Sequence, residues 1–443
     1  MPTTDLSPGD DIIRTTTTSL NTLPPEWRLT TIGEQFDVQQ GKALSPAVRS
    51  GRSYRPFLRT SNVLWGRLDL TAVDQMDFTE DEANRLALRS GDLLVCEGGE
   101  VGRTAIWHQE IPDCLFQNHL HRLRAKTPHV HPEFVMYWMQ AALLHLGLYG
   151  GIANKTTIPN LSGGRLKNLS IPLPMLSEQQ AIANVLTKIR SALQVQGMTI
   201  AKLKELKAAT IAKLFREGLR GEPLKQTEIG EIPVSWQLVP IETLGTLITG
   251  TTPPTEHREY YDGGVPFISP ADITDMRVID HTEKTLSRAG LAVARPLPPK
   301  SVLIVCIGST IGKVGMTIHP SSCTNQQINA IVCSEPFCPE FAHYLMVAQA
   351  DRIRALSSPG PVPILNKGAF GKILVPVPND KSDQDQIAGV LSAIDDSLLA
   401  AQRAATSGGT IFSALLKLLL SGDIRMVGFV SAHQSAVRGI PTS

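Results

Sequence analysis

Polar side chains that could read bases and hold phosphates recur at matching places in two halves of the chain. Arg, Lys, Asn and Gln donate hydrogen bonds that base edges and phosphate oxygens can accept. Any one of these residues could sit on an ordinary surface loop, but their recurrence with different chemistry in each half suggests one scaffold reading two targets. The candidates are Lys42, Arg52, Arg59, Asn62, Arg103, Asn118, His119, Asn154 and Lys155 in the first half, and Thr251, Thr252, His257, Arg258, Ser309, Thr310, Lys313, Asn325, Gln326, Gln327 and Lys367 in the second.

Within the second half, the candidates divide by the kind of contact that each can make. Lys313 and Lys367 carry point charges and suit phosphate oxygens. The amides of residues 325–327 suit base edges, because an Asn or Gln amide can pair bidentately with adenine.

The sequence shows no complete motif for catalysis. The stretch from Gly308 to Lys313 resembles a phosphate-binding loop, but its glycines are one residue too close and Val314 replaces the metal-binding Ser or Thr. The histidines do not fall at metal-ligand spacing. We find no convincing nucleophile–base pair and no Asn-Pro-Pro-aromatic tetrapeptide. We therefore expect no catalytic residue, no metal site and no bound cofactor.

The positions of the candidates follow from a duplication. The sequence LPPEWRLTTI around Trp27 returns as IPVSWQLVPI around Trp236, and a glycine stands fourteen residues after each tryptophan (41 − 27 and 250 − 236). A repeat of about 205 residues is a duplicated domain rather than a solenoid. Alternating β-branched runs and turns predict sheet-dominated α+β domains. The strands are expected at 92–96, 101–106, 119–124, 265–268, 302–307, 314–318 and 328–333, and the helices at 132–148 and 339–356.

A long helix is predicted after each domain. Apolar residues step by four and three alternately over four heptads, which is typical of a coiled-coil seam. Matching length and stride favour pairing of the two helices, although each could instead lie on its own domain. The adjacent glycines 408 and 409 predict a kink or break in the second helix. The seam residues are Ile182, Leu186, Ile189, Leu193, Leu203, Ile387, Leu391, Ile394, Leu398 and Leu415.

Composition indicates a globular protein of the reducing cytoplasm. Hydrophobic residues make up 42% of the chain, the net charge is +1, and we find no uninterrupted apolar run near the ~20 residues that span a bilayer. Cys96 and Cys306 occupy equivalent apolar segments and are interpreted as core residues. We expect a disordered extension at 1–22, a flexible tail at 426–443 and no membrane association.

Four stretches carry a family resemblance. Residues 250–254, Gly-Thr-Thr-Pro-Pro, precede residues 260–268, which end in Gly-Gly-Val-Pro-Phe-Ile; Pro-Leu-Pro at 172–174 precedes Ser-Glu-Gln-Gln-Ala-Ile-Ala at 177–183. In this order and duplication the chain resembles the DNA-specificity subunit of a type I restriction–modification system, over residues 23–425. It departs from the family pattern at Thr251, which replaces a glycine, and in the first copy, where Gly41-Lys42-Ala43 lacks Thr-Pro.

The resemblance implies both architecture and function. Two similar β-rich target-recognition domains, 23–175 and 221–380, would be separated by helices at 176–220 and 381–425 that form an antiparallel coiled coil with pseudo-two-fold symmetry. Each domain would read half of a split, asymmetric double-stranded DNA target. Two modification subunits would methylate adenine with S-adenosylmethionine, and restriction subunits would use ATP and Mg for translocation and cleavage. The alternatives are a duplicated coiled-coil scaffold without DNA specificity and a self-contained methyltransferase or nuclease.

Overall fold

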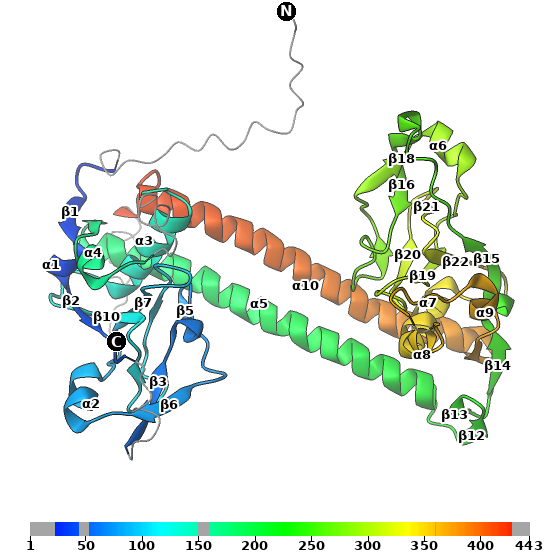
Figure 1. Cartoon of the computed structure of the whole chain (residues 1–443), viewed down its shortest axis with the longest axis horizontal. Coiled ribbons are helices and arrows are strands. Elements are labelled where there is room, and N and C mark those ends of the chain that lie inside the picture. The colour runs from blue at the N-terminus through cyan, green and yellow to red at the C-terminus, as the bar shows by residue number, and fades with distance from the viewer. Residues whose placement is uncertain (1–22, 44–52, 149–159, 359, 428–443) are drawn as a thin grey trace, which may run out of the picture. The chain divides into compact units, whose positions relative to one another are not determined.

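The computed structural model describes residues 23–43, 53–148, 160–358 and 360–427. These residues fall into two compact units, of which unit 1 comprises Met1–Gln194 with Ser407–Ser443, and unit 2 comprises Val195–Thr406. Each unit mixes helices and sheets (Figure 1), so the expected α+β class is confirmed. The pseudo-two-fold symmetry between the halves stays a prediction.

Unit 1 contains a four-stranded sheet in the order β2-β10-β7-β8, a three-stranded sheet in the order β6-β3-β9, and the pairs β1-β11 and β4-β5. Its elements are β1 (Arg28–Thr31), α1 (Ile32–Gln35), β2 (Phe36–Gln40), β3 (Tyr54–Leu58), η3 (Thr60–Asn62), β4 (Val63–Leu64), β5 (Arg67–Leu68), β6 (Asp74–Asp77), α2 (Glu80–Leu86), β7 (Leu93–Cys96), β8 (Thr104–Ile106), β9 (Leu115–Phe116), β10 (Leu120–Ala125), α3 (Pro132–Leu144), α4 (Gly163–Lys167), β11 (Ser170–Leu173) and the first part of α5 (Leu176–Glu217).

Unit 2 repeats this plan with a five-stranded sheet in the order β15-β22-β19-β20-β17, a three-stranded sheet in the order β18-β16-β21, and the pairs β14-β23 and β12-β13. Its elements are β12 (Leu224–Thr227), β13 (Gly230–Pro233), β14 (Trp236–Pro240), η4 (Ile241–Leu244), β15 (Gly245–Thr249), η5 (Arg258–Tyr260), β16 (Tyr261–Ile268), β17 (Val278–Ile279), β18 (Lys284–Leu286), α6 (Arg288–Val293), β19 (Val302–Val305), β20 (Val314–Thr317), β21 (Cys323–Thr324), β22 (Ile328–Cys333), α7 (Pro339–Ala348), α8 (Ala350–Ala355), α9 (Lys367–Gly371), β23 (Leu374–Pro378) and the first part of α10 (Lys381–Ser421).

The duplication read from the sequence is therefore a duplication of topology. Strands β2, β10, β7 and β8 of unit 1 correspond in order and antiparallel pairing to β15, β22, β19 and β20 of unit 2. Each predicted strand overlaps an observed strand. The predicted helix at 132–148 is α3, while the one at 339–356 is interrupted between α7 and α8.

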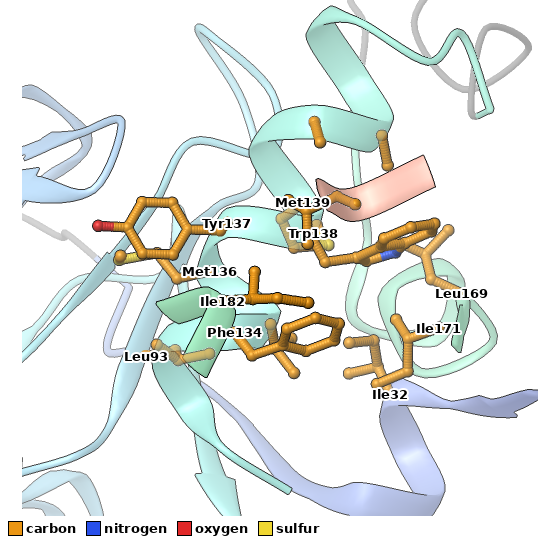
Figure 2. Close-up of a cluster of buried hydrophobic side chains, with 14 of the residues drawn as sticks. Ile32, Leu93, Phe134, Met136, Tyr137, Trp138, Met139, Leu169, Ile171 and Ile182 are labelled. Atoms are coloured by element: carbon orange, nitrogen blue, oxygen red, sulfur yellow. The ribbon is translucent and has the colours of Figure 1, made fainter. Parts of the chain in front are cut away.

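The core of unit 1 forms where α3 packs on the sheet and on the long helices. Figure 2 shows side chains from α1, β7, α3, β11 and α5 meeting in one cluster, among them Ile32, Phe134 and Ile182. All three of these side chains are fully buried. Unit 2 has the equivalent core, in which Phe215 of α5 stacks beside Trp236 and Phe341. A polar substitution in either cluster would thus weaken the packing of both the domain and the long helix.

The less exposed positions of both long helices follow the predicted four-three stride. From residue 182 of α5 and from residue 387 of α10, every stride position is buried or half-buried. Within unit 1, Arg190 of α5 lies over the Phe412 ring and Leu193 meets Gly408, so the two helices run antiparallel. Within unit 2, Gln196 bonds Ala401 and Lys207 pairs with Asp395, again antiparallel. Both alternatives considered for the helices hold in part, because Ile182, Leu186, Ile387 and Leu391 also sit in domain cores.

The break predicted at the two glycines is wrong. Helix α10 continues without interruption through Gly408 and Gly409. A Cβ atom on Gly408 would lie 2.8 Å from Cδ2 of Leu193, so the missing side chain lets α10 approach α5 closely. Packing against the neighbouring helix thus outweighs the low helix propensity of glycine.

Among the described residues, α10 is the one helix long and apolar enough to cross a membrane by length and composition. Its apolar side chains have another role here. Phe412, Leu416, Leu419 and Leu420 are buried in the core cluster of unit 1. These side chains pack the last turns of α10 against the domain of unit 1.

Candidate nucleic-acid interface

The register of the five-stranded sheet brings three polar loops of unit 2 to one end. The last residue of β15, Thr249, pairs with Asn329 at the start of β22, and Ile328 pairs with Val305 at the end of β19. Because β20 starts beside the end of β19, the turn between them lies at the same end. The loops at 250–252, 306–313 and 324–327 therefore come together, as does α9, since Leu365 donates to the Cys306 carbonyl.

In each unit a glycine lets one of these loops pack directly on the backbone of the next. A Cβ atom on Gly250 would lie 2.1 Å from the Asn325 carbonyl oxygen, and a Cβ atom on Gly41 would lie 2.2 Å from the Gln117 carbonyl oxygen. These are the two glycines that follow the repeated tryptophans by fourteen residues (41 − 27 and 250 − 236). The shared glycine thus has a steric cause, which is the packing of one loop backbone directly on the next.

Several candidates in unit 2 contact one another at this end. The Thr252 hydroxyl donates to Gln326 Oε1 at 2.6 Å, and Asn325 Nδ2 donates to Gln327 Oε1 at 2.9 Å. Lys313 Nζ donates to the Ile273 carbonyl at 3.0 Å while its side chain remains exposed. Thr251 and Thr310 are half-buried, and Ser309 and Lys367 are exposed. The loops therefore present amides, hydroxyls and two ammonium groups on one surface.

His257 and Arg258 enter this region from a different element. Both are exposed at the start of η5, where the His257 ring stacks on Tyr260 at 5.0 Å. The Tyr261 hydroxyl donates to the Pro253 carbonyl at 2.6 Å and so ties this segment to the loop after β15. The pKa of Glu259 is lowered by its own backbone hydrogen bond and by its hydrogen bond to His257.

Unit 1 forms the same end from β2, β10 and β7. Gln40 pairs with His121, and Leu120 pairs with Cys96, so the loops after β2 and before β10 meet. The backbone N–H of Asn118 donates to the Lys42 carbonyl at 2.9 Å, and His119 is exposed beside it. Asn118 and His119 therefore lie where the equivalent candidates of unit 2 gather.

Two candidates of unit 1 make their hydrogen bonds inside the domain, and their role in DNA contact stays a prediction. Lys42 Nζ pairs with Glu82 at 2.5 Å and donates to the Asp77 carbonyl, and its side chain is only 13% exposed. Asn62 is 4% exposed and uses its amide to donate to the carbonyls of Asp69 and Ala72. Both side chains hold loops together, because buried polar groups are satisfied internally.

Of the other candidates of unit 1, two make hydrogen bonds or ion pairs within the domain, and three lie outside the described residues. Arg59 pairs with Asp74 at 3.0 Å and remains about half-exposed. Arg103 donates to the Thr60 carbonyl at 3.1 Å and is mostly covered. Arg52, Asn154 and Lys155 lie outside the described residues.

Some polar residues at these ends were missed by the sequence analysis. Arg295 is exposed and donates to the Thr249 carbonyl at 2.9 Å, next to Gly250. In unit 1, Glu97 accepts a hydrogen bond from Gln40 at 2.9 Å and lies 3.8 Å from His121. Burial lowers the pKa of His121, which keeps this ring neutral. Arg295 lies where the repeat pattern is weak, so no signal in the sequence singled it out.

The turn from Gly308 to Lys313 is a tight connection between two antiparallel strands. Gly308 and Gly312 have φ angles of 100° and 90°, which favour glycine, and Lys313 donates its amide to the Thr310 carbonyl. Across the described ranges, no group of three or more His, Cys, Asp and Glu could hold a metal ion. The predicted core cysteines are buried, and burial raises the pKa of Cys96 and of Cys306 to about 11.

Comparisons with known proteins identify the family of the repeated domain. A family model described as the type I restriction modification DNA specificity domain matches the chain twice, at residues 24–205 and 233–405. The chain is 24% identical over 425 residues to a putative type I restriction enzyme MjaX specificity subunit of Methanocaldococcus jannaschii, covering 89% of this chain and 95% of that protein. It is 34% identical over 154 residues to the HindI specificity subunit of Haemophilus influenzae, which is 33% of each chain.

The fold is also similar to that of a solved structure. The crystal structure of a type I restriction–modification system S subunit from M. genitalium superposes with a TM-score of 0.58 at 18% identity, over 90% of this chain and 97% of that one. At this identity the likeness concerns the fold.

Proposed function

Because this chain belongs to the type I restriction–modification DNA specificity family and is a specificity subunit of that kind, we propose that its two units each read one half of a split, asymmetric duplex DNA target. In this proposal the polar loop ends at β15–β22–β19 and at β2–β10–β7 face the DNA. Partner modification subunits, two per complex, methylate adenine with S-adenosylmethionine, and restriction subunits use ATP and Mg. The chain itself contributes recognition in the cytoplasm and no chemistry.

The observation that carries the proposal is the difference between two equivalent loop ends. Both units use the same strand order and the same glycine contact, yet the side chains presented there differ. Unit 2 offers Thr252, Gln326 and Lys313, whereas unit 1 offers Asn118 and His119. Hydrogen-bond donors and acceptors on a fixed framework suit base readout in the major groove, and different sets imply different half-sites.

A scaffold without DNA specificity is the second candidate. It accounts for the helices and cores, but it gives no reason for polar loops that differ between equivalent ends. A self-contained enzyme would need a cofactor site of its own. Calorimetry of the purified chain with S-adenosylmethionine tests this alternative, and stoichiometric binding would contradict the proposal.

The proposal is tested by methylome sequencing of cells with and without this gene. We expect a methylated motif made of two parts separated by a fixed gap, present only when the gene is present. Exchange of residues 26–170 for those of a relative should change one part of the motif and leave the other unchanged. A motif that is unaffected by deletion of the gene, or that changes in both parts after the exchange, would count against the proposal.

A further inference from the structure

The contact between α5 and α10 in unit 1 is built around a cation between aromatic rings. The Arg190 guanidinium lies 4.4 Å from the Tyr137 ring centroid and 5.2 Å from that of Phe412. It donates to the neutral amide oxygen of Gln140 at 2.6 Å. Burial lowers the pKa of this arginine, and the charges of Tyr137 and Glu133 raise it by less. Arg190 is therefore held by rings and an amide, with Phe412 as the contribution of α10.

The same place in unit 2 is built around an ion pair. Lys207 Nζ of α5 lies 2.6 Å from Asp395 Oδ1 of α10, and the two side chains are only 14% and 5% exposed. The Tyr344 hydroxyl donates to Asp395 Oδ2 at 2.6 Å, and Lys207 lies 5.9 Å from the Tyr344 ring centroid. A buried carboxylate here depends on the lysine that the other helix supplies.

These two contacts are copies of one another with the chemistry exchanged. Asp395 of α10 is the equivalent of Arg190 of α5, at an offset of 205 (395 − 190), and Phe412 is the equivalent of Lys207 at the same offset (412 − 207). The tyrosine on the domain helix, Tyr137 or Tyr344, is present in both. Each helix thus supplies one residue to each contact. Helix α5 supplies two cations, Arg190 and Lys207, while α10 supplies the carboxylate of Asp395 and the ring of Phe412.

Pairing of two identical helices, one from each of two copies of the chain, would bring unsuited side chains together. If α5 of one copy paired antiparallel with α5 of a second copy, Arg190 would face Lys207, which places two cations together. If α10 paired with α10, Asp395 would face Phe412, which leaves a buried carboxylate without a cation. Duplicated domains with similar helices would otherwise be able to exchange them between copies of the chain.

We propose that Arg190, Lys207, Asp395 and Phe412 form a partner-selecting surface that makes α5 pair with α10 and reject the same helix of a second copy. The selection resembles that of coiled coils, in which a few polar positions at the seam determine which helices associate. It is independent of DNA recognition, because none of the four residues lies at the polar loop ends.

The test uses the complete chain with a protease site inserted after Gly221, which is exposed and has no atom within 4 Å of a built Cβ. After cleavage, two differently tagged copies are mixed, unfolded in denaturant and refolded, and the pairs of pieces are counted by native mass spectrometry. We expect pairs of an N-terminal with a C-terminal piece to exceed like pairs by more than about 100-fold, given the cost of an unpaired buried charge.

The decisive variant is Lys207→Glu with Asp395→Lys, which reverses the ion pair and so retains it within unit 2. In an α5–α5 pair the reversed residue 207 would meet Arg190 as an opposite charge, and in an α10–α10 pair residue 395 would meet the Phe412 ring as a cation. Like pairs should therefore increase by about tenfold or more.

A matched control and a second variant complete the experiment. Lys202→Glu with Ala400→Lys changes exposed positions of the same two helices and should leave the pairing unchanged. Lys207→Phe with Asp395→Arg gives both helices the chemistry of unit 1, so like pairs should increase here too, even if the reversed ion pair does not fold. Abundant like pairs in the wild type, or exclusive unlike pairs in both variants, would overturn the proposal.

Discussion

Arg425 binds Glu178 through two parallel hydrogen bonds, from Nε to Oε1 at 2.8 Å and from Nη2 to Oε2 at 2.9 Å. The arginine lies just beyond the end of α10, and the glutamate lies in the first turn of α5. Unit 2 holds the equivalent pair, in which Arg220, just beyond α5, binds Asp383 in the first turn of α10 at 2.7 Å. Each unit therefore fastens the end of one long helix to the beginning of the other.

Arg425→Ala should lower the free energy of unfolding by about 2–3 kcal/mol, because Glu178 is 3% exposed and would lose its cation. The hydrogen bonds that Arg425 donates to Glu178 raise the pKa of Arg425. Arg220→Ala is the matched control and should cost less: Asp383 is also buried, at 7% exposed, but Arg220 gives it one hydrogen bond instead of two, from a side chain that is 63% exposed. Urea denaturation measures both, and an equal or greater loss for Arg220→Ala would contradict this ranking.

Leu391→Asp should unfold unit 2 or destabilise it severely. The leucine is fully buried with Phe341 and Tyr344, so the change removes about 1.5–3 kcal/mol of apolar burial and adds the cost of a buried carboxylate. Val390→Asp changes the neighbouring residue, which is 46% exposed, and should cost no more than about 0.5 kcal/mol. Circular dichroism during thermal melting distinguishes the two, and similar melting of both variants would refute the assigned face of α10.

Lys367→Ala should weaken binding of the chain to duplex DNA of any sequence and lower the slope of log affinity against log salt by about 1. Lys367 is exposed on the first turn of α9, beside the polar loops of unit 2. Lys202→Ala removes another exposed lysine, from the middle of α5, and should leave the slope unchanged. Fluorescence anisotropy over a salt series provides the measurement, and identical slopes for both variants would place the DNA elsewhere.

Gly66→Ala should cost about 0.5–2 kcal/mol more than Gly91→Ala. Both glycines have a positive φ angle, 68° and 90°, which an L-residue adopts at a cost of about 1–2 kcal/mol. Only at Gly66 would the new Cβ meet another group, Nη1 of Arg190 at 1.2 Å, and move that guanidinium off its rings. In the background Arg190→Ala the difference between the two substitutions should vanish; its persistence would show another cause.

Acid should destabilise unit 2 through His343. Burial lowers the pKa of this histidine to about 3, whereas an unfolded histidine titrates near 6.5. Below pH 6.5 the histidine of the unfolded chain therefore binds a proton, while that of the folded chain stays unprotonated. The free energy of unfolding consequently decreases as the pH falls towards about 3. Between pH 7 and pH 5 the loss from this group is about 2 kcal/mol. His343→Leu should flatten the curve by that amount, and parallel stability curves would contradict the explanation.

Apolar periodicity predicted the framework better than side-chain type predicted the interface. The strands around Leu94 and Leu303 and the stride of both helices were readable because burial imposes a regular spacing on apolar residues. Lys42 and Asn62 look in sequence like Lys313 and Asn325, yet the first two side chains are largely covered by their domain, whereas Lys313 is exposed and Asn325 is half-buried. Residue type shows that a group can donate a hydrogen bond, but only the packing of the loops decides where the acceptor lies.

The thiols, of which five are buried and that of Cys333 is half-buried, give each unit a reporter of its own opening. Cys96 and Cys114 belong to unit 1, and Cys306, Cys323, Cys333 and Cys338 to unit 2. Burial raises the pKa of all six to about 11 or 12, so the folded chain presents almost no thiolate to an alkylating reagent at neutral pH. Modification must then wait for the surrounding structure to open. Peptide mapping after timed alkylation would consequently reveal which half of the wild-type chain opens more often, without any engineered label.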